Sequence, residues 1–152
     1  MDATLIPVRL TLQSSSRDDS GEVDAPVRIM TTGQLKETPS GYLLRYVESA
    51  TDEGTGEVTS SQVTLSLQPN RVVMNRAGEF GTTMVFVKDK RFEGLYHTPY
   101  GDMGLALYTT HVYCKATPTK GTVRLEYQID MHGHYASTQT IALDYVAEVA
   151  PC

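Results

Sequence analysis

A regular alternation of apolar and polar residues in the segment TVRLEYQIDMHG constrains the fold more than any other feature of the chain. The apolar positions of this segment are Val123, Leu125, Tyr127, Ile129 and Met131. Because successive side chains of a strand point to opposite faces of the sheet, the pattern predicts a half-buried antiparallel strand. One face of this strand lies in a core and the other faces water.

The same period of two recurs along the chain, with turn residues between the repeats. TQTIALDYVAEV alternates in the same way, and the link before it, His132-Gly133-His134, is short and contains glycine, as expected for a hairpin. The other predicted strands are IPVRLTLQ, PVRIMTTGQLK, YLLRYVES, VTSSQVTLSLQ, RVVMNR, TTMVFV, RFEGLYH and MGLALYTTHVYCKA. The last of these is either one long strand or two strands joined by a bend. The intervening segments, such as SSSRDDSGEVDA and ATDEGTGE, are predicted loops.

No segment sustains a helical period over ten residues, so the sheet has to cover its own apolar face. A chain of consecutive hairpins does this most simply by closing on itself, which also removes exposed strand edges. The sequence therefore predicts an all-β fold, a closed or nearly closed antiparallel up-and-down barrel of about 8–10 strands. With 152 residues, the chain is predicted to form a single domain, 1–152.

Charge and hydropathy argue against several classes of partner. Thirteen Lys and Arg against eighteen Asp and Glu give a net charge of −5, and no basic cluster is present, which argues against nucleic-acid binding. No window approaches eighteen apolar residues and the start lacks the features of a signal peptide, so we expect no membrane association and a cytoplasmic location. In a reducing compartment Cys114 and Cys152 are expected to be free, with Cys152 a possible reactive surface thiol.

The histidines do not form a convincing metal or catalytic site. His132 and His134 would share a strand face, but they flank a turn glycine and no nearby Cys or His completes a zinc set. His111 is predicted to lie on an exposed strand face, and His97 on the outside of the barrel, on the same face as Glu93. We therefore expect neither a catalytic residue nor a metal ligand among the four.

Other chemical motifs are also missing from the sequence. The acidic runs around Asp18-Asp19 and Asp52-Glu53 do not have the spacing of a calcium-binding loop, and no P-loop, GxGxxG or GxSxG motif occurs. The sequence thus predicts no cofactor and no enzymatic activity. The segment HTPYG is predicted to be a turn between two barrel strands, with Tyr100 packing over a barrel end.

Tyrosine and arginine supply the candidate ligand-binding residues. Nine tyrosines against three phenylalanines favour side chains with an apolar body and a polar tip. Arg76 lies on the same strand face as Val72 and Met74. If that face points inward, the guanidinium lies in the barrel interior, where it would have to be paired or bind an anion such as a ligand carboxylate. Alternatively, Arg76 reaches the rim, or it pairs internally with a carboxylate such as Glu48. The candidate ligand-binding residues are Arg76, Tyr42, Tyr46, Tyr96 and Tyr127.

Several of these residues belong to a longer pattern that resembles the DUF1934 family of small bacterial proteins. The resemblance runs from about Val27 to Val149, and the stretch before Val27 matches less well. Its pieces are Thr32-Gly33, Tyr46 with Glu48, Arg76 with Gly78, Met84 with Phe86, and Pro99-Tyr100-Gly101 followed by Leu105, Leu107 and Thr109. The resemblance implies a calycin-like closed barrel, similar to lipocalins, in a bacterial cytoplasm, and it implies no established activity.

Two functions of different classes are compatible with this architecture, and an enzyme is the third and weakest alternative. In the first, the barrel binds a small amphipathic or anionic ligand in its interior, oriented by the tyrosines and Arg76. In the second, the barrel is filled by its own side chains and serves as a protein-interaction or scaffold domain without a small-molecule ligand. The presence of an interior cavity distinguishes the two.

Overall fold

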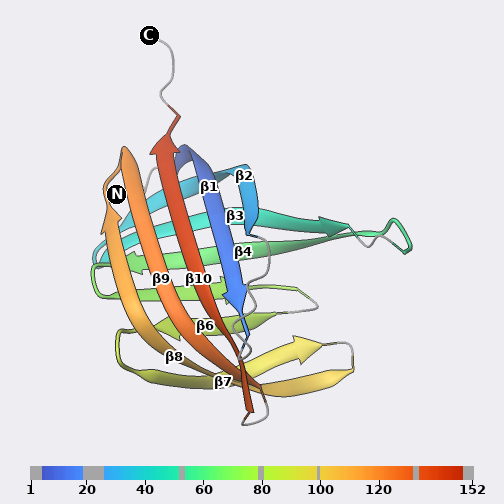
Figure 1. Ribbon diagram of the computed structural model, residues 1–152. Helices are drawn as coiled ribbons and strands as arrows, with labels where there is room; N and C mark the ends of the chain where they lie inside the picture. The colour runs from blue at the N-terminus through green and yellow to red at the C-terminus, as the bar shows by residue number, and fades with distance from the viewer. Residues whose placement is uncertain are drawn as a thin grey trace.

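The computed structural model describes residues 5–18, 26–51, 54–78, 81–98, 100–131 and 134–148, apart from the side chains of residues 50, 51, 59, 131 and 134–136. Within this part of the chain it contains ten β-strands connected in series (Figure 1). The strands are β1 (Leu5–Arg17), β2 (Val27–Thr38), β3 (Gly41–Thr51), β4 (Val58–Gln68), β5 (Arg71–Arg76), β6 (Thr82–Phe86), β7 (Arg91–Thr98), β8 (Gly101–Ala116), β9 (Lys120–Met131) and β10 (His134–Ala147).

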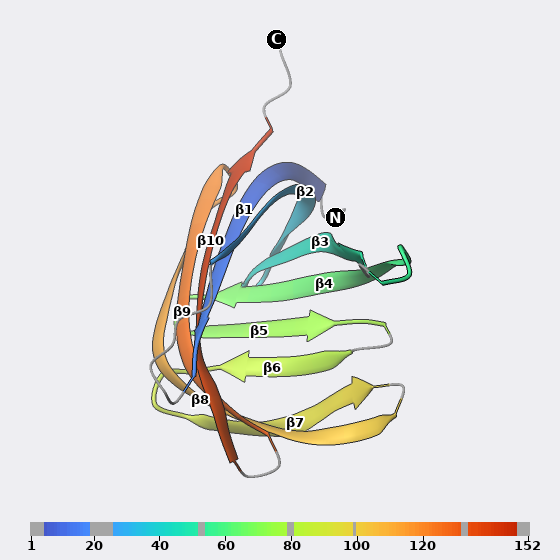
Figure 2. The same cartoon turned by 45° about the vertical axis from the view of Figure 1, so that its right-hand side comes forward.

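Each strand pairs in antiparallel fashion with the next one in the sequence, and β1 also pairs with β10, which closes the sheet into a barrel. The prediction of an all-β, closed up-and-down barrel is therefore confirmed, and the topology is consistent with a calycin-like barrel. Figure 2 shows β4, β5 and β6 side by side on one wall, with β1, β9 and β10 crossing them steeply on the opposite wall. Among the residues described here, none forms a helix that is long and apolar enough to cross a membrane.

The predicted alternation in the C-terminal hairpin is also confirmed. Val123, Leu125 and Tyr127 of β9 are buried, and Leu143 and Tyr145 of β10 are buried beside them. These side chains lie inside because both strands have their odd positions on the inner face of the barrel. The polar residues between them lie on the outer face.

β8 is one long strand that contains a bend. Its register with β9 shifts between Thr109 and His111, so one residue is inserted relative to the partner strand. Such a β-bulge exchanges the two faces of a strand. Leu107 and Thr109 therefore point inward before the bulge, whereas Val112 and Cys114 contact the core after it.

β1 is longer than the sequence predicted, because it continues through a segment that the alternation assigned to a loop. Ser14 to Arg17 pair with Ile141 to Thr138 of β10. Three successive serines give no alternation, so the pattern could not reveal this part of the strand. Backbone pairing and side-chain hydrogen bonds stabilise it instead, including a bond of 2.9 Å from Gln139 Nε2 to Ser16 Oγ.

Two pairs of neighbouring strands in the barrel wall share only a few paired residues. β2 and β3 pair only from Gly33 to Thr38 of β2, and β6 and β7 share the single pair Thr82 and Tyr96. The contact between β6 and β7 is strengthened by the Thr82 hydroxyl, which donates a hydrogen bond to the Leu95 carbonyl at 3.1 Å. Because the pairing between β2 and β3 stops at Gly33 and Tyr46, these two strands can diverge near the end at which β3 finishes.

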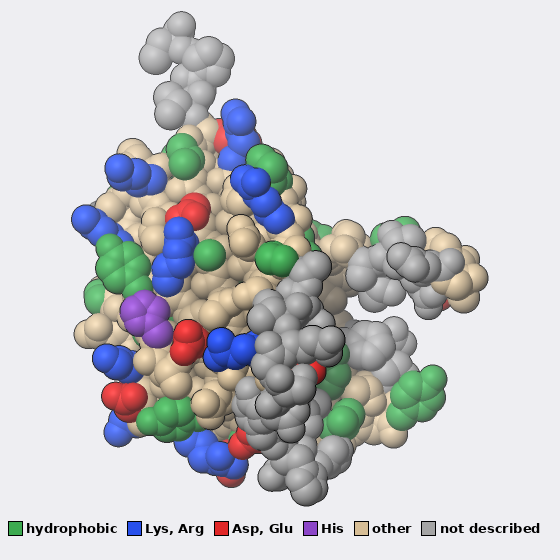
Figure 3. Space-filling model, viewed as in Figure 1, with side chains coloured by type: hydrophobic (Ala, Val, Ile, Leu, Met, Phe, Trp, Pro, Cys, Tyr) green, Lys and Arg blue, Asp and Glu red, His purple; other side chains and the backbone are tan. Residues whose placement is uncertain are grey.

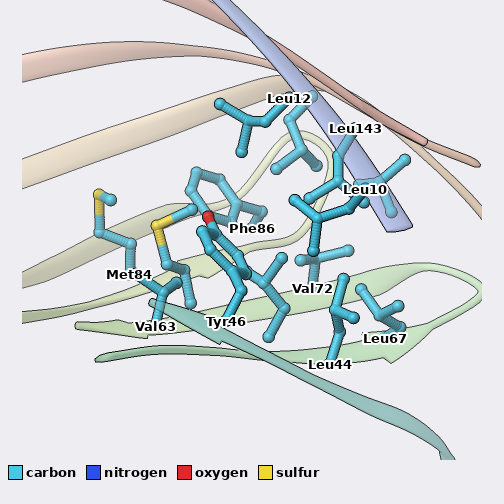
Figure 4. Close-up of a cluster of buried hydrophobic side chains, with 14 of the residues drawn as sticks. Leu10, Leu12, Leu44, Tyr46, Val63, Leu67, Val72, Met84, Phe86 and Leu143 are labelled. Carbon is cyan, nitrogen blue, oxygen red and sulfur yellow. The ribbon is translucent and has the colours of Figure 1, made fainter. Parts of the chain in front are cut away.

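A dense apolar core fills the barrel interior and extends toward the opposite end (Figure 4). Tyr46 lies within this cluster, between Met84 on one side and Leu44 and Leu67 on the other. Tyr145 seals the closed end, since it is 1% exposed and its hydroxyl donates to the Thr117 carbonyl at 2.8 Å. The inward-facing side chains at this end leave little free space.

The outer face formed by β8, β9, β10 and β1 has mixed charge. Figure 3 shows its Lys and Arg side chains scattered among Asp, Glu and uncharged side chains. Several of the charges are paired across strands, for example Arg124 with Asp144 at 3.1 Å and Arg9 with Glu148 at 3.7 Å. In this view the described residues form no continuous basic surface.

Candidate functional site

A cavity of about 340 Å³ lies inside the barrel at the end where β1, β3 and β5 finish and β6 and β10 begin. We call it the end cavity. Its apolar lining comes from Leu12, Met74, Met84, Leu105, Ile129 and Ile141. Its polar lining comes from Ser14, Tyr46, Glu48, Arg76, Thr82, Tyr96, Tyr127 and Gln139. The end cavity thus combines apolar side chains with a comparable number of polar ones.

Arg76 is the last residue of β5 and lines the end cavity, on the same inward face as Val72 and Met74. Its Nε and one terminal guanidinium nitrogen both lie 3.0 Å from Oε2 of Glu48. Val63 of β4 pairs with Tyr46 of β3 on one side and with Arg76 of β5 on the other. Arg76 is therefore level with Tyr46, and its side chain reaches across β4 to Glu48, two residues further along β3. The alternative that Arg76 pairs internally with Glu48 is therefore the arrangement found. Both side chains are one-quarter exposed.

Two tyrosines place their hydroxyl groups beside this ion pair. Tyr46 and Tyr127 are 4% and 5% exposed, and both line the end cavity. Burial raises the pKa of Tyr46 well above its usual range, and the nearby Glu48 carboxylate raises it further, while Arg76 opposes both effects. Burial also raises the pKa of Tyr127 to about 12. Both phenols therefore keep their protons at neutral pH and act as hydrogen-bond donors.

Aromatic packing holds Tyr127 in place. Its ring centroid lies 4.8 Å from that of Phe86, with the two rings inclined at 56°. A tilted pair at this distance is a favourable arrangement for aromatic rings. Thr109 pairs with Tyr127 across the ladder and is fully buried, yet its hydroxyl has no hydrogen-bond partner among the described residues. Tyr127 of the cavity lining is thus packed against Phe86, and the buried Thr109 hydroxyl opposite it is unsatisfied.

Four of the five predicted ligand-binding residues come together in the end cavity: Arg76, Tyr46, Tyr96 and Tyr127. Tyr42 does not join them. It shares the inward face of β3 with Tyr46, but it lies four residues away, roughly 13 Å along an extended strand. At that position it pairs with Leu67 and packs against the closed end of the core. The alternation along β3 predicts that the two tyrosines share a face, but it gives no distance between them along the barrel axis.

Several lining residues were not among the predicted site residues. Ser14 and Gln139 enter the cavity from β1 and β10, and Glu48 was considered only as a partner of Arg76. All three occupy inward-facing positions near the end of a strand. A polar residue at such a position is a usable signal, because the inward positions nearer the middle of the same strands are apolar.

The two histidines whose side chains the structure describes do not line the end cavity. His97 and His111 are exposed, as predicted, and His97 Nδ1 lies 2.7 Å from Oδ1 of Asp102. The candidate pair His132 and His134 lies outside the residues whose side chains are described. No group of three His, Cys, Asp or Glu suited to a metal ion occurs in the residues that the structure describes.

The remaining predicted features fall partly outside those residues. Cys114 is a free thiol, as expected, and burial raises its pKa to about 11. Cys152 lies outside the described residues. Of the two acidic runs, Asp18 is included, while Asp19 and 52–53 are not.

The prediction that Tyr100 packs over a barrel end is wrong, since this side chain is 99% exposed. The turn folds on itself: the Thr98 hydroxyl donates to the Gly101 carbonyl at 2.6 Å and accepts from the Tyr100 amide at 3.1 Å. Gly101 has a φ of +120°, which glycine adopts readily. The β7–β8 hairpin extends away from the barrel wall (Figure 1), which takes Tyr100 off the core. Pro99 itself is not described.

Comparison with known proteins identifies relatives of this barrel. The family model "Domain of unknown function (DUF1934)" matches residues 10–143, so the match includes most of β1, which the sequence pattern had left out of the resemblance. The crystal structure of the ywiB protein from Bacillus subtilis has a TM-score of 0.79 and 19% sequence identity, covering 97% of this chain and 96% of that one. That likeness supports the fold.

A second solved structure, a protein of unknown function from Bacteroides ovatus, has 10% identity and covers 96% of this chain and 45% of that one. Its TM-score is 0.35, so it carries no argument about this barrel. No curated protein matches the chain. The family match spans most of the sequence, and the chain belongs to the DUF1934 family.

Proposed function

We propose that this protein binds a small amphipathic molecule in the end cavity. The observation that carries the proposal is the cavity of about 340 Å³, in which apolar side chains and converging polar groups line the same space. Ligand pockets in proteins also combine apolar surface with positioned polar groups, and they occupy about 300–1,000 Å³. A barrel filled by its own side chains would leave no such space, so the cavity favours ligand binding over the filled-barrel alternative.

The lining suggests how an amphipathic molecule would be oriented. An apolar chain would contact Leu12, Met74 and Leu105, and the flexible methionine side chains can adapt to its shape. A polar group would meet the Arg76–Glu48 pair and the tyrosine hydroxyls. At about 30 Å³ for each water-sized group, the end cavity holds about eleven such groups, the size of a compound with an eight-carbon chain.

The chemistry of the polar groups supports binding rather than catalysis. Tyr46 and Tyr127 keep their protons at neutral pH because their pKa values are raised, so neither serves as a nucleophile or a general base. Arg76 is compensated by Glu48. Each of these groups is suited to holding a polar atom of a ligand in a fixed position.

The proposal is tested by filling the cavity. Met74→Trp places a large ring among the lining side chains, whereas Asn75→Trp adds the same ring at the next, exposed position of β5 as a matched control. Binding of 1-octanol, followed by ligand-observed NMR, is expected for the wild type and Asn75→Trp and not for Met74→Trp. Thermal unfolding checks that both variants fold.

Absence of 1-octanol binding to the wild type, or equal binding to both variants, would contradict the proposal. Native mass spectrometry of the protein purified from the organism that encodes it provides a second test. A reproducible additional mass that disappears in Met74→Trp supports an internal ligand. An additional mass that persists in this variant places the ligand elsewhere.

A further inference from the structure

The formal charges of the side chains that line the end cavity cancel without a ligand. Arg76 and Glu48 are its only ionisable acid–base pair, and among the described residues of the lining no other Lys, Arg, Asp or Glu is present. Both guanidinium contacts converge on one oxygen of Glu48 at 3.0 Å. The formal charge of the lining is therefore zero, so an ionised ligand would introduce a charge without a free counter-ion.

Two buried phenol hydroxyls in the end cavity are available to donate hydrogen bonds to a ligand. The hydroxyls of Tyr46 and Tyr127 make no hydrogen bond to a described residue, although both side chains are at least 95% buried. Burial raises both pKa values, so the hydroxyls remain protonated. The Gln139 amide nitrogen is already engaged by Ser16 at 2.9 Å and by Ser137 at 2.7 Å. A ligand atom that accepts hydrogen bonds is therefore needed beside the two phenols.

We propose, on the basis of the binding function proposed above, that the end cavity selects amphipathic molecules with an uncharged, hydrogen-bond-accepting polar group. A primary amide or an ester carbonyl accepts from the phenols and adds no charge. A carboxylate accepts equally well, but it places a second negative charge beside Glu48. Partial burial of an unbalanced charge costs more than the added hydrogen bonds return. An ammonium group is also disfavoured, since it would compete with Arg76 for Glu48, the single carboxylate among the lining residues that the structure describes.

Three compounds with the same eight-carbon chain test this selectivity: octanamide, octanoate and octylammonium. Dissociation constants measured at pH 8 by ligand-observed NMR are expected to be at least tenfold lower for octanamide than for either ion. In Glu48→Gln, Arg76 loses its counter-ion but keeps its charge. Octanoate is then expected to bind at least tenfold more tightly than to the wild type and to overtake octanamide.

Glu37→Gln is the matched control, because Glu37 is exposed on β2 at the other end of the barrel. It should leave the order of the three compounds unchanged. The double variant Glu48→Gln with Arg76→Met restores a neutral lining and should restore the preference for octanamide over octanoate. This variant also keeps the test decisive if Glu48→Gln alone does not fold.

The outcomes separate this inference from the binding function itself. If octanoate binds the wild type as tightly as octanamide does, or if Glu48→Gln leaves the octanoate affinity unchanged, the selectivity is wrong while binding stands. If none of the three compounds binds the wild type or any folded variant, the proposed binding function fails. Equal gains in octanoate affinity in Glu48→Gln and Glu37→Gln would attribute the change to net charge rather than to the end cavity.

Discussion

Replacing Gly121 with alanine tests how the closed end of the barrel is sealed. Gly121 lies in β9 directly beneath the ring of Tyr145. A Cβ atom built on Gly121 would lie 2.1 Å from Cε2, 2.4 Å from Cζ and 2.6 Å from the hydroxyl oxygen of Tyr145. Such distances do not occur between unbonded atoms, so the ring must move.

The size of the effect follows from what the displaced ring loses. Overpacking of a well-packed core costs about 1–3 kcal/mol. Movement of the ring also breaks the hydrogen bond of 2.8 Å from the Tyr145 hydroxyl to the Thr117 carbonyl, which contributes about 0.5–1.5 kcal/mol. We expect Gly121→Ala to lower the free energy of unfolding by about 2–4 kcal/mol. For a chain of this length the midpoint of thermal unfolding then falls by about 5–15 °C.

Gly104→Ala is the matched control, because a Cβ atom on Gly104 meets nothing within 4 Å. Its stability should stay within about 1 kcal/mol of the wild type. Thermal and urea unfolding of both variants provide the comparison. In a Tyr145→Leu background, Gly121→Ala should cost less than about 1 kcal/mol, since the clashing ring atoms are gone. Equal costs for the two glycine variants, or an undiminished cost in the Tyr145→Leu background, would refute the reasoning.

Two further predictions concern buried polar groups. Thr109→Val replaces a buried, unpartnered hydroxyl with a methyl group of similar size, so urea unfolding should show a gain of about 1–2 kcal/mol; a loss would mean that the hydroxyl has a partner. Burial raises the pKa of Cys114 to about 11 and that of Tyr127 to about 12, so the folded state retains protons that the unfolded state releases. Stability should therefore be complete below about pH 9 and fall as the pH rises toward 12, and Tyr127→Phe should flatten this decline. Urea unfolding midpoints that are the same at pH 8 and pH 11 would contradict this.

Much of the fold was predictable because most strands have one face in the core and one in water. That condition imposes a period of two on strands such as β9, and the closure of the barrel follows from the absence of any helix to cover the sheet. The period of two is lost where a strand has no apolar face. Ser14 to Arg17 pair with β10 by backbone hydrogen bonds, yet their side chains carry no apolar alternation.

The candidate site was predictable in part, for a related reason. The alternation of side chains along a strand shows which residues share a face, and Arg76, Tyr46 and Tyr127 each share the inner face with apolar neighbours. The alternation does not show how far along the barrel axis each residue lies, because this depends on the register between strands. Tyr42 therefore faces inward, as expected, but lies at the closed end. Similarly, the exposure of Tyr100 depends on how far a hairpin extends beyond its neighbours.

The inward-facing residues of single strands nevertheless contain information about the two ends of the barrel. In β1 these residues change from Val8 and Leu10 to Ser14, and in β3 from Leu44 to Glu48. The same change occurs in β5, from Met74 to Arg76, and, in the opposite direction of the chain, in β10, where Gln139 precedes Leu143. Because neighbouring strands are antiparallel, the polar ends of β1, β3 and β5 and the start of β10 all meet at one end of the barrel. A polar residue at the inward-facing end of several alternate strands therefore predicts a lined cavity there, even when no conventional motif is present.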